Sequence, residues 1–419
     1  MSSQSTNKNY RWNFAVNLLD GATYWFGSSF IAGSTILPLF ISKLTTSLWP
    51  IGLLSLISSA GWFLPQLFAA RITEKYKKMK TIVVGWGLFL ERLPVWVMVL
   101  SALIARRLPL AALILFMFCM IWYVFGAGVV APSWMGLLAK LFSPEKRGSF
   151  LGITMFLGAG MGALGSGVSA YLLNSLEFPN SFIGLFGIAA IFMTISWGFL
   201  ALTREPYGEV ETRDLDFRSY WGDLLKILRS DHNFRKFNLS NIVVALGSMG
   251  AGFLTISALR RFDVSDATVG LYTLSMLIGQ TVGNLVLGWM ADKFGHKLSL
   301  EIGILASVIA FGLSVFISIP ELYFLVFVLH GITLSSGIVS GMLVVWEFCE
   351  ISRVPTYSGL ANTIRGIVSI LAPLVATQLA QSSYRLLFGI SAILSLIGLL
   401  MMHFWVQEPR WHASETEIS

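Results

Sequence analysis

Long hydrophobic stretches separated by short polar connections dominate this sequence. A helix that crosses a bilayer needs about 20 mostly apolar residues, and about twelve stretches reach that length. Their approximate limits are 12–41, 47–70, 81–105, 108–138, 149–174, 181–203, 237–259, 268–291, 298–319, 322–349, 358–381 and 384–406. Several contain Pro and Gly, which membrane helices tolerate when neighbouring helices satisfy the freed backbone groups. The pattern predicts an all-α integral membrane protein with about twelve transmembrane helices.

The composition supports this prediction. Hydrophobic residue types make up 55% of the chain and charged types 12%, against roughly 25% charged residues in an ordinary soluble domain. So few charges cannot cover a water-soluble surface, and lipid is therefore the expected solvent. The formal net charge is +7, but the Lys and Arg residues lie between hydrophobic stretches. That placement is typical of membrane topology and argues against a nucleic-acid partner.

The distribution of Lys and Arg also predicts the orientation. An even number of spans places both termini on one face of the membrane. About 21 of the 29 Lys and Arg residues fall on that face and about 6 on the other, so that face is expected to be cytoplasmic. We predict a multi-pass protein of the plasma (cytoplasmic) membrane. Arg106, Arg107, Arg260 and Arg261 depart locally from the rule, and residues 1–11 do not resemble a signal peptide.

The longest connection, residues 204–236, divides the chain into two halves. Within it, hydrophobic residues recur at helical spacing with charged residues between them: Phe217, Trp221, Leu224, Leu225 and Leu228. This spacing predicts an amphipathic helix at the cytoplasmic surface, with an ordinary solvated linker as the alternative. The expected organisation is a six-helix bundle over 1–203, a cytoplasmic linker over 204–236 and a second six-helix bundle over 237–419.

Three short matches indicate that the halves are related. "AARITEKYKKMK" after span two aligns with "GWMADKFGHK" after span eight, which places Glu74 opposite Asp292. "KRGSFLG" aligns with "TYSGLAN", and "TREP" at 203–206 aligns with "VQEP" at 406–409. The matches occur in the same order in both halves, which is typical of an internal duplication.

The connection after span eight resembles the loop signature G-x-x-x-D-[RK]-x-G-[RHK]-[RK] of the major facilitator superfamily. The matching residues are Gly288, Asp292, Lys293, Gly295, His296 and Lys297. In the first-half copy, Glu74 replaces the Asp and Lys75 the Arg, while Ala70 and Lys77 replace the glycines. The resemblance covers the whole chain and leaves the subfamily unassigned. It implies two pseudo-symmetric six-helix bundles, a secondary transporter that works by alternating access, and no cofactor.

By this resemblance, Asp292 latches the cytoplasmic side when the protein opens outward, and Arg147 is the candidate partner. Gly288, one turn before the Asp, would allow a neighbouring helix to approach closely. A carboxylate at the membrane edge can also face the N–H groups of a helix N-terminus. The alternative is that the loop only anchors the topology.

Ionisable groups inside the first-half spans are candidates for function, because charges in a bilayer are costly. Asp20 lies in span one, and Glu91 and Arg92 lie in span three. Adjacent helix residues point about 100° apart, so we expect no pair between Glu91 and Arg92. Asp20 and Arg92 lie at compatible depths. A structural ion pair and a proton or substrate site both remain open.

In the second half, His330 lies inside span ten, Glu347 near its cytoplasmic end, and Arg365 in span eleven. We predict a Glu347–Arg365 pair near the cytoplasmic gate. His330 is either a group that couples transport to protons or a buried residue whose hydrogen bonds are made within the core. No role is assigned to Glu301 or His403. The family resemblance implies that spans one, four, seven and ten line the cavity, so the candidate substrate-facing residues are Asn17, Asp20, Trp134, Asn241 and His330.

The sequence shows no motif of a nucleotide-binding or hydrolytic enzyme. "GMGALG" at 160–165 fits G-x-G-x-x-G but lies in a hydrophobic span without a preceding strand, so it indicates close helix packing. We therefore expect a monomeric, non-enzymatic transporter of a small molecule, coupled to protons or another gradient. The alternatives are an exporter of amphipathic drugs or lipids, and a membrane sensor or docking protein that transports nothing.

Overall fold

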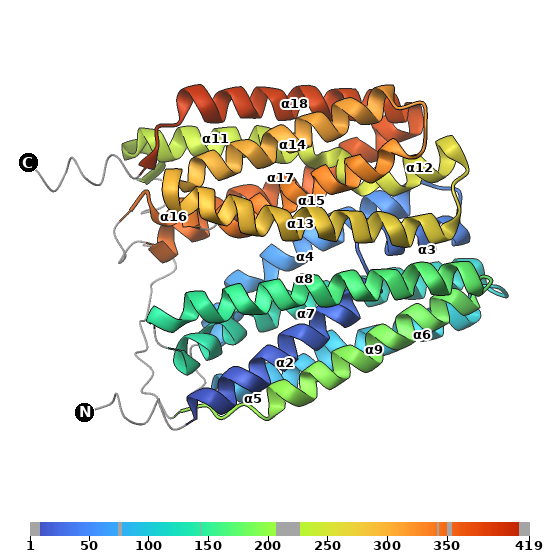
Figure 1. Ribbon diagram of the computed structural model, residues 1–419, viewed down its shortest axis with the longest axis horizontal. Helices are drawn as coiled ribbons and strands as arrows, with labels where there is room; N and C mark the ends of the chain where they lie inside the picture. The colour runs from blue at the N-terminus through green and yellow to red at the C-terminus, as the bar shows by residue number, and fades with distance from the viewer. Residues whose placement is uncertain are drawn as a thin grey trace, which may run out of the picture. The chain divides into compact units, whose positions relative to one another are not determined.

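The computed structural model describes residues 9–73, 78–142, 144–206, 227–341, 343–349 and 354–409. Within these ranges the chain is helical, with no strands (Figure 1). Packing divides it into two units, Met1–Thr212 with Val264–Leu274, and Arg213–Asp263 with Ser275–Ser419. Ten helical segments in the described part are long and apolar enough to cross a membrane. The all-α membrane fold predicted from the hydrophobic pattern is confirmed.

The first unit contains the first six predicted spans. Span one is broken into α2 (Tyr10–Ser29) and α3 (Ile36–Leu44). Span three is α5 (Met79–Gly87), the π-helical turn η1 (Leu88–Arg92) and α6 (Leu93–Ile104). The remaining spans are α4 (Trp49–Thr73), α7 (Pro109–Leu141), α8 (Pro144–Ser175) and α9 (Asn180–Ala201). Helix α2 packs against α8 and α9, and α4 packs against α7.

The second unit contains the other six spans. Span seven is α11 (His232–Gly247), the 3₁₀ turn η2 (Ser248–Phe253) and α12 (Leu254–Phe262). The others are α13 (Asp266–Phe294), α14 (His296–Phe316), α15 (Leu322–Ser340) with the short α16 (Leu343–Trp346), α17 (Val354–Ser382) and α18 (Tyr384–Trp405). The first residues of α13 count with the first unit, where Asp266 pairs with Lys43 at 2.7 Å.

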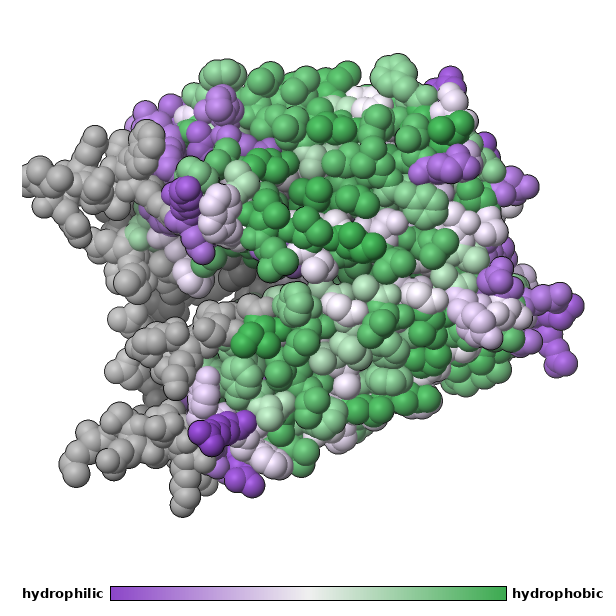
Figure 2. All heavy atoms as spheres, viewed as in Figure 1, coloured by the Kyte–Doolittle hydropathy of each residue, from purple (hydrophilic) through white to green (hydrophobic). Residues whose placement is uncertain are grey.

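Hydrophobic side chains cover the helices and hydrophilic ones gather at their ends (Figure 2). This is the distribution expected of helices whose middle portions contact lipid.

Arg261, one of the departures from the positive-inside pattern, has a structural role at a helix end. Its guanidinium donates to the carbonyls of Ser314 at 2.6 Å and Ile317 at 2.9 Å. It thereby satisfies backbone acceptors that the C-terminus of α14 leaves without a partner.

The same contacts recur in both halves, as the duplication predicts. Asn13 and Arg204 exchange two hydrogen bonds between the side chain of one and the backbone of the other, at 2.9 and 3.0 Å. Asn233 and Gln407 exchange the same two bonds at 2.9 and 3.1 Å. Each pair ties the first helix of its half to the segment that follows the sixth.

Close helix packing recurs as well. Gly61 and Gly128 bring α4 and α7 together in the first unit, and Gly279 and Gly331 bring α13 and α15 together in the second. A Cβ at any of these positions would collide with the facing helix. Small residues at such crossings allow helices to pack by van der Waals contact in lipid.

The Glu in "TREP" binds the start of span three. Glu205 accepts hydrogen bonds from the backbone N–H groups of Met79 at 3.1 Å and Lys80 at 2.9 Å, and pairs with Lys140 at 3.0 Å. Its side chain is only 5% exposed. These N–H groups have no partner within α5, and a carboxylate there is also favoured by the helix dipole.

The equivalent Glu in "VQEP" lies at the start of span nine. Gly295 precedes α14 with φ 104° and ψ 152°, a conformation nearly restricted to glycine. A Cβ there would come within 2.6 Å of the Glu408 carboxyl group. In both halves, the segment after the sixth span therefore places a carboxylate, Glu205 or Glu408, beside the start of the third span.

We predict that Glu205→Ala destabilises the protein by about 3 kcal/mol, because two helix N–H groups and Lys140 lose their acceptor in a buried site. The thermal unfolding midpoint of purified protein in detergent measures this effect. Glu177→Ala, at an exposed loop position, is the control and should leave the midpoint unchanged. An unaltered midpoint in Glu205→Ala would contradict the capping role.

The two signature glycines should respond differently to Ala. Gly295→Ala should cost about 1–3 kcal/mol from backbone strain and also displace Glu408. Gly288→Ala should be nearly neutral, because in the described part of the chain a Cβ there meets nothing within 4 Å. Thermal midpoints of the two variants, measured side by side, test this. Equal effects would show that φ at 295 is not the constraint.

Candidate functional site

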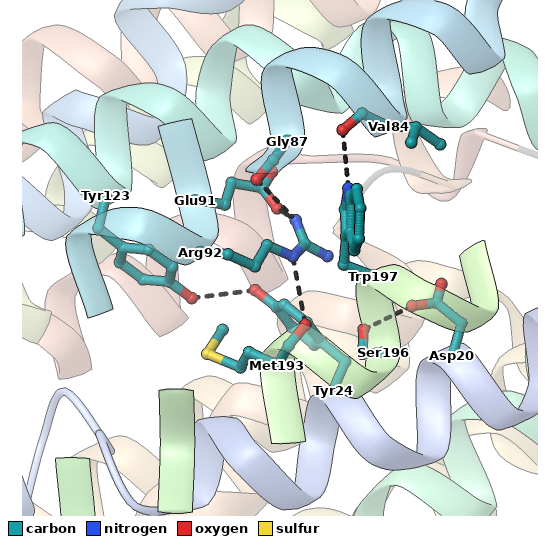
Figure 3. Close-up of polar contacts among 10 residues, drawn as sticks. All are labelled: Asp20, Tyr24, Val84, Gly87, Glu91, Arg92, Tyr123, Met193, Ser196 and Trp197. Carbon is teal, nitrogen blue, oxygen red and sulfur yellow. Dashed lines mark hydrogen bonds and ion pairs between the residues drawn. The ribbon is translucent and has the colours of Figure 1, made fainter. Parts of the chain in front are cut away.

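Asp20 lies inside the first unit and joins two helices. It projects from the middle of α2, is 7% exposed, and accepts a 2.6 Å hydrogen bond from the Ser196 hydroxyl of α9 (Figure 3). The positive charge of Arg92 also acts on this carboxylate. The acid thus has a neutral hydrogen-bond donor in contact and a cation further away.

The prediction that Glu91 and Arg92 do not pair is wrong. The Arg92 guanidinium forms an ion pair with the Glu91 carboxylate, and both residues are buried. The prediction assumed a regular α-helix, whereas these residues end the π-helical turn η1. Arg92 also donates to the carbonyl of Gly87, the last residue of α5, at 3.5 Å, and to the Met193 carbonyl of α9 at 3.4 Å.

Aromatic residues surround this ion pair. The Arg92 guanidinium lies over the ring of Tyr24, 5.8 Å from its centroid, and the Tyr24 hydroxyl bonds to that of Tyr123 from α7 at 3.0 Å (Figure 3). Trp197 Nε1 donates to the Val84 carbonyl of α5 at 2.7 Å. Four spans thus contribute to one polar cluster, which we call the Asp20–Arg92 cluster: Asp20, Tyr24, Glu91, Arg92, Tyr123 and Ser196.

The other first-half candidates are also engaged within the unit. The Asn17 amide donates to the Asn13 carbonyl at 2.8 Å and to the Thr203 hydroxyl at 3.1 Å. Trp134 is partly buried and packs against the hydrophobic core around Leu137 and Phe150. Asn17 and Asp20 therefore bond to α9 and the segment that follows it, and their role in facing the substrate stays a prediction.

Arg365 has different partners from those predicted. From α17 it donates to the Gly341 carbonyl and to the Asn241 side chain of α11, both at 3.4 Å. Glu347 instead lies 3.9 Å from His296 Nε2. The structure therefore brings Arg365 and Asn241 together and places Glu347 beside the signature loop. The prediction used only the nearness of both residues to the cytoplasmic ends of their spans, and such depth does not determine which neighbouring helix a side chain meets.

His330 is buried within α15. His296, by contrast, begins α14 and bonds through Nδ1 to the Ser340 hydroxyl at 3.1 Å. Among the described residues, no group of three or more His, Cys, Asp or Glu side chains could hold a metal ion.

The signature at 288–297 covers the end of α13, Gly295 and the start of α14. Asp292 is exposed near the C-terminus of α13, and Lys293 lies over the rings of Trp289 and Phe294 at 5.2 and 5.0 Å. Lys297 pairs with Glu301 at 3.4 Å. The expected close helix approach at Gly288 is wrong for the described part of the chain, where the space beside it is open.

Several predicted residues lie outside the described part of the chain. Glu74 and Lys75 fall in the undescribed range 74–77, and the side chain of Arg147 is not described. The predicted amphipathic helix is described only from residue 227, where Ile227 packs into the core of the second unit. The gating roles of Glu74, Lys75, Arg147 and Asp292 stay predictions.

Sequence reasoning missed the neutral partners of the buried charges. Ser196, Tyr24 and Tyr123 are common residue types in hydrophobic helices, and only their hydrogen bonds distinguish them. Glu205 and Glu408 marked the repeat, but neither the capping role of Glu205 nor the position of Glu408 beside Gly295 was predicted. A usable signal was present, since an acidic residue follows the last span of each half at the same place.

Comparison with known proteins supports the fold. The family model described as Major Facilitator Superfamily matches residues 237–417. The tetracycline resistance protein, class B, of Escherichia coli is 24% identical over 175 residues, and the match spans 40% of this chain and 43% of that protein.

Solved structures match over nearly the whole chain. The nucleoside transporter NupG has a TM-score of 0.70 at 14% identity, covering 94% of this chain and 99% of its own. The D-xylose-proton symporter has a TM-score of 0.68 at 15% identity, covering 96% and 99%. These matches show that the chain has the fold of major facilitator superfamily transporters, and its second half matches the model of that family.

Proposed function

We propose that this protein is a secondary active transporter that moves a small solute across the cytoplasmic membrane by alternating access. The observation that carries the proposal is the presence of ionisable groups inside both units, Asp20, Glu91 and Arg92 in one and His330 and Arg365 in the other. Charges at such depth are costly and mark substrate or ion pathways by default. Ionisable residues inside both halves of a duplicated bundle are expected of a transporter of this kind.

Asp20 is the proposed coupling group. Its hydrogen-bond donor is the neutral Ser196 hydroxyl, so it can take up a proton without breaking an ion pair. Glu91 is different, because protonation would leave the buried Arg92 without its counterion. The Glu91–Arg92 pair is therefore assigned a structural role, and Asp20 the role of carrying the proton.

Arg365 favours a solute with an anionic group. A guanidinium has five N–H donors, and among the described residues that of Arg365 donates to two neutral oxygens, both at 3.4 Å. Both bonds are long, so most of its donor capacity remains for a carboxylate or phosphate, which Arg binds in a bidentate manner. Asn241 would then orient the guanidinium rather than bind the solute directly.

Export of an amphipathic drug is a second candidate. The similarity to a tetracycline resistance protein favours it, although the match covers less than half of that protein. In both cases we infer cytoplasmic termini, a monomer and no enzymatic activity. A thermal-shift screen of tetracycline, nucleosides, sugars and organic anions would select the solute, because a bound solute stabilises the folded state. Everted vesicles with and without a pH gradient would then separate export from uptake.

We predict that Asp20→Asn abolishes solute accumulation driven by a pH gradient but retains solute exchange at zero gradient, because the amide preserves shape and cannot carry a proton. Proteoliposomes loaded with the solute found in the screen measure both activities. Glu321→Gln, at an exposed position before α15, should behave as wild type. Gradient-driven accumulation in Asp20→Asn, or loss of exchange together with accumulation, would contradict the coupling role.

For an anionic solute, Arg365→Gln should weaken binding at least tenfold, about 1.4 kcal/mol or more, because the charge-assisted hydrogen bonds are lost. Arg365→Lys should recover only part of the affinity, since Lys lacks the bidentate geometry. The solute-dependent rise in melting temperature measures both effects. Arg106→Gln, at an exposed helix end, is the control. Equal affinity of Arg365→Gln and wild type for the anionic solute would show that Arg365 does not bind it.

A further inference from the structure

Ser196 has an unusual hydrogen-bond partner for a hydroxyl inside a membrane span. Ser and Thr in helices commonly donate to a carbonyl one turn back, and Thr194 of the same helix donates to Ala190 at 2.7 Å. Ser196, whose side chain is fully buried, donates instead to Oδ1 of Asp20 at 2.6 Å. A hydroxyl has one proton to donate, so the Phe192 carbonyl, one turn back from Ser196, does not receive it.

The Asp20 carboxylate receives this hydrogen bond and, among the described residues, no other. The contact joins the middle of α2 to α9, where the two side chains point toward each other (Figure 3). Hydrogen bonds to charged groups are about twice as strong as neutral ones, so this donor strongly stabilises the carboxylate. The Ser196 hydroxyl therefore favours the ionised form of Asp20.

The other charged and titratable groups near Asp20 have partners of their own. Arg92 acts on the carboxylate through its charge but forms its ion pair with Glu91. The hydroxyls of Tyr24 and Tyr123 bond to each other at 3.0 Å. Helix α9 has no ionisable residue, and those of α8, which also packs against α2, lie toward its ends: Glu145, Lys146, Arg147 and Tyr171. Ser196 is therefore the group through which α9 responds to the charge of Asp20.

Proton uptake changes what Asp20 requires from Ser196. An ionised carboxylate only accepts hydrogen bonds, whereas a protonated carboxyl group also has an O–H to donate. A buried donor without an acceptor is unfavourable, and the Ser196 oxygen lies within hydrogen-bond distance. If Ser196 accepts this bond, its own proton is free to reach the Phe192 carbonyl, as the Thr194 proton reaches Ala190. Every donor then has an acceptor in both protonation states.

We propose that Ser196 is a positioning residue for the coupling proton, and that it reverses its hydrogen bond when Asp20 is protonated. With Asp20 ionised, the Ser196 hydroxyl donates to the carboxylate. When one proton from water binds Asp20, the carboxyl O–H donates to Ser196 Oγ and the Ser196 hydroxyl turns to the Phe192 carbonyl. No bond between heavy atoms is made or broken. This inference rests on the proposed role of Asp20 as the coupling group.

The reversal links proton binding to the packing of two helices. Helices α2 and α9 stay joined in both states, but the bond between them changes from a charge-assisted one to a neutral one. The ionised state has the stronger bond, so Ser196 determines how high the pH can rise before Asp20 loses its proton. A hydroxyl at this position thus adjusts the pH range in which a proton gradient can drive transport.

Infrared difference spectroscopy of the purified protein in proteoliposomes, titrated with pH and without solute, tests the proposal. The protonated carboxyl band that disappears in Asp20→Asn identifies Asp20. Ser196→Ala should raise the pH midpoint of this band by about one unit or more, because the ionised form loses the stronger bond. Ser196→Thr, which keeps the hydroxyl, should restore the wild-type midpoint. Ser166→Ala, which removes a buried hydroxyl bonded to its own helix, should leave the midpoint unchanged.

An isotope label on the backbone carbonyl carbon of phenylalanine tests the reversal itself. In wild type, a labelled carbonyl band should shift as Asp20 titrates, because the Phe192 carbonyl gains a donor. The shift should be absent in Ser196→Ala, which has no hydroxyl, and in Asp20→Asn, which cannot titrate. This measurement uses the wild-type protein for its main result and so does not depend on how well a variant folds.

The possible failures are distinguishable. An unchanged midpoint in Ser196→Ala would overturn the role of Ser196 and leave Asp20 as the coupling group. A titrating Asp20 band without any shift of a labelled phenylalanine carbonyl would overturn the reversal. If no carboxyl band is lost in Asp20→Asn, Asp20 does not take up a proton, and its proposed coupling role fails together with this inference.

Discussion

The core of a bilayer offers no hydrogen-bond partner to a polar group, and this constraint governs where the polar side chains of the protein lie. Ser and Thr meet it locally by bonding to a carbonyl one turn back, as Ser166 and Thr377 do. The larger polar groups cannot be satisfied within one regular helix and join neighbouring helices instead. Asp20 joins α2 to α9, and Arg365 joins α17 to α11. Charged residues therefore act as crosslinks inside each unit, alongside any role in transport.

Most of the fold could be predicted because lipid imposes a simple pattern on sequence. A span must be about 20 residues long and mostly apolar, so composition alone locates it. The breaks in regular α-helix within individual spans could not be predicted in this way. The break between α2 and α3 and the 3₁₀ turn η2 leave the hydrophobic pattern unchanged. They depend on contacts with other helices, such as the packing of Gly250 against Ser391.

The charged residues of the candidate site could be predicted from the sequence. The residues with which they pair could not. Asp20, Arg92 and Arg365 stand out in apolar stretches, so depth alone identifies them. Their partners depend on the rotation of each helix about its axis, which sequence spacing does not determine. The Glu347–Arg365 prediction failed for this reason. The cap at Glu205 and the position of Glu408 beside Gly295 require a further fact, that the end of the sixth span of each half lies beside the start of the third.

The π-helical turn at Leu88–Arg92 has a consequence for comparing this chain with its relatives. In that turn the N–H of Leu93 reaches the carbonyl five residues back, where an α-helix would use four. One additional residue rotates the rest of the span by about 100° relative to a continuous α-helix. A relative without the turn can match the lipid-facing and buried positions of α6 only if its sequence is one residue shorter within this span. Alignments that forbid gaps inside membrane helices will therefore place residues 93–104 one position out of register.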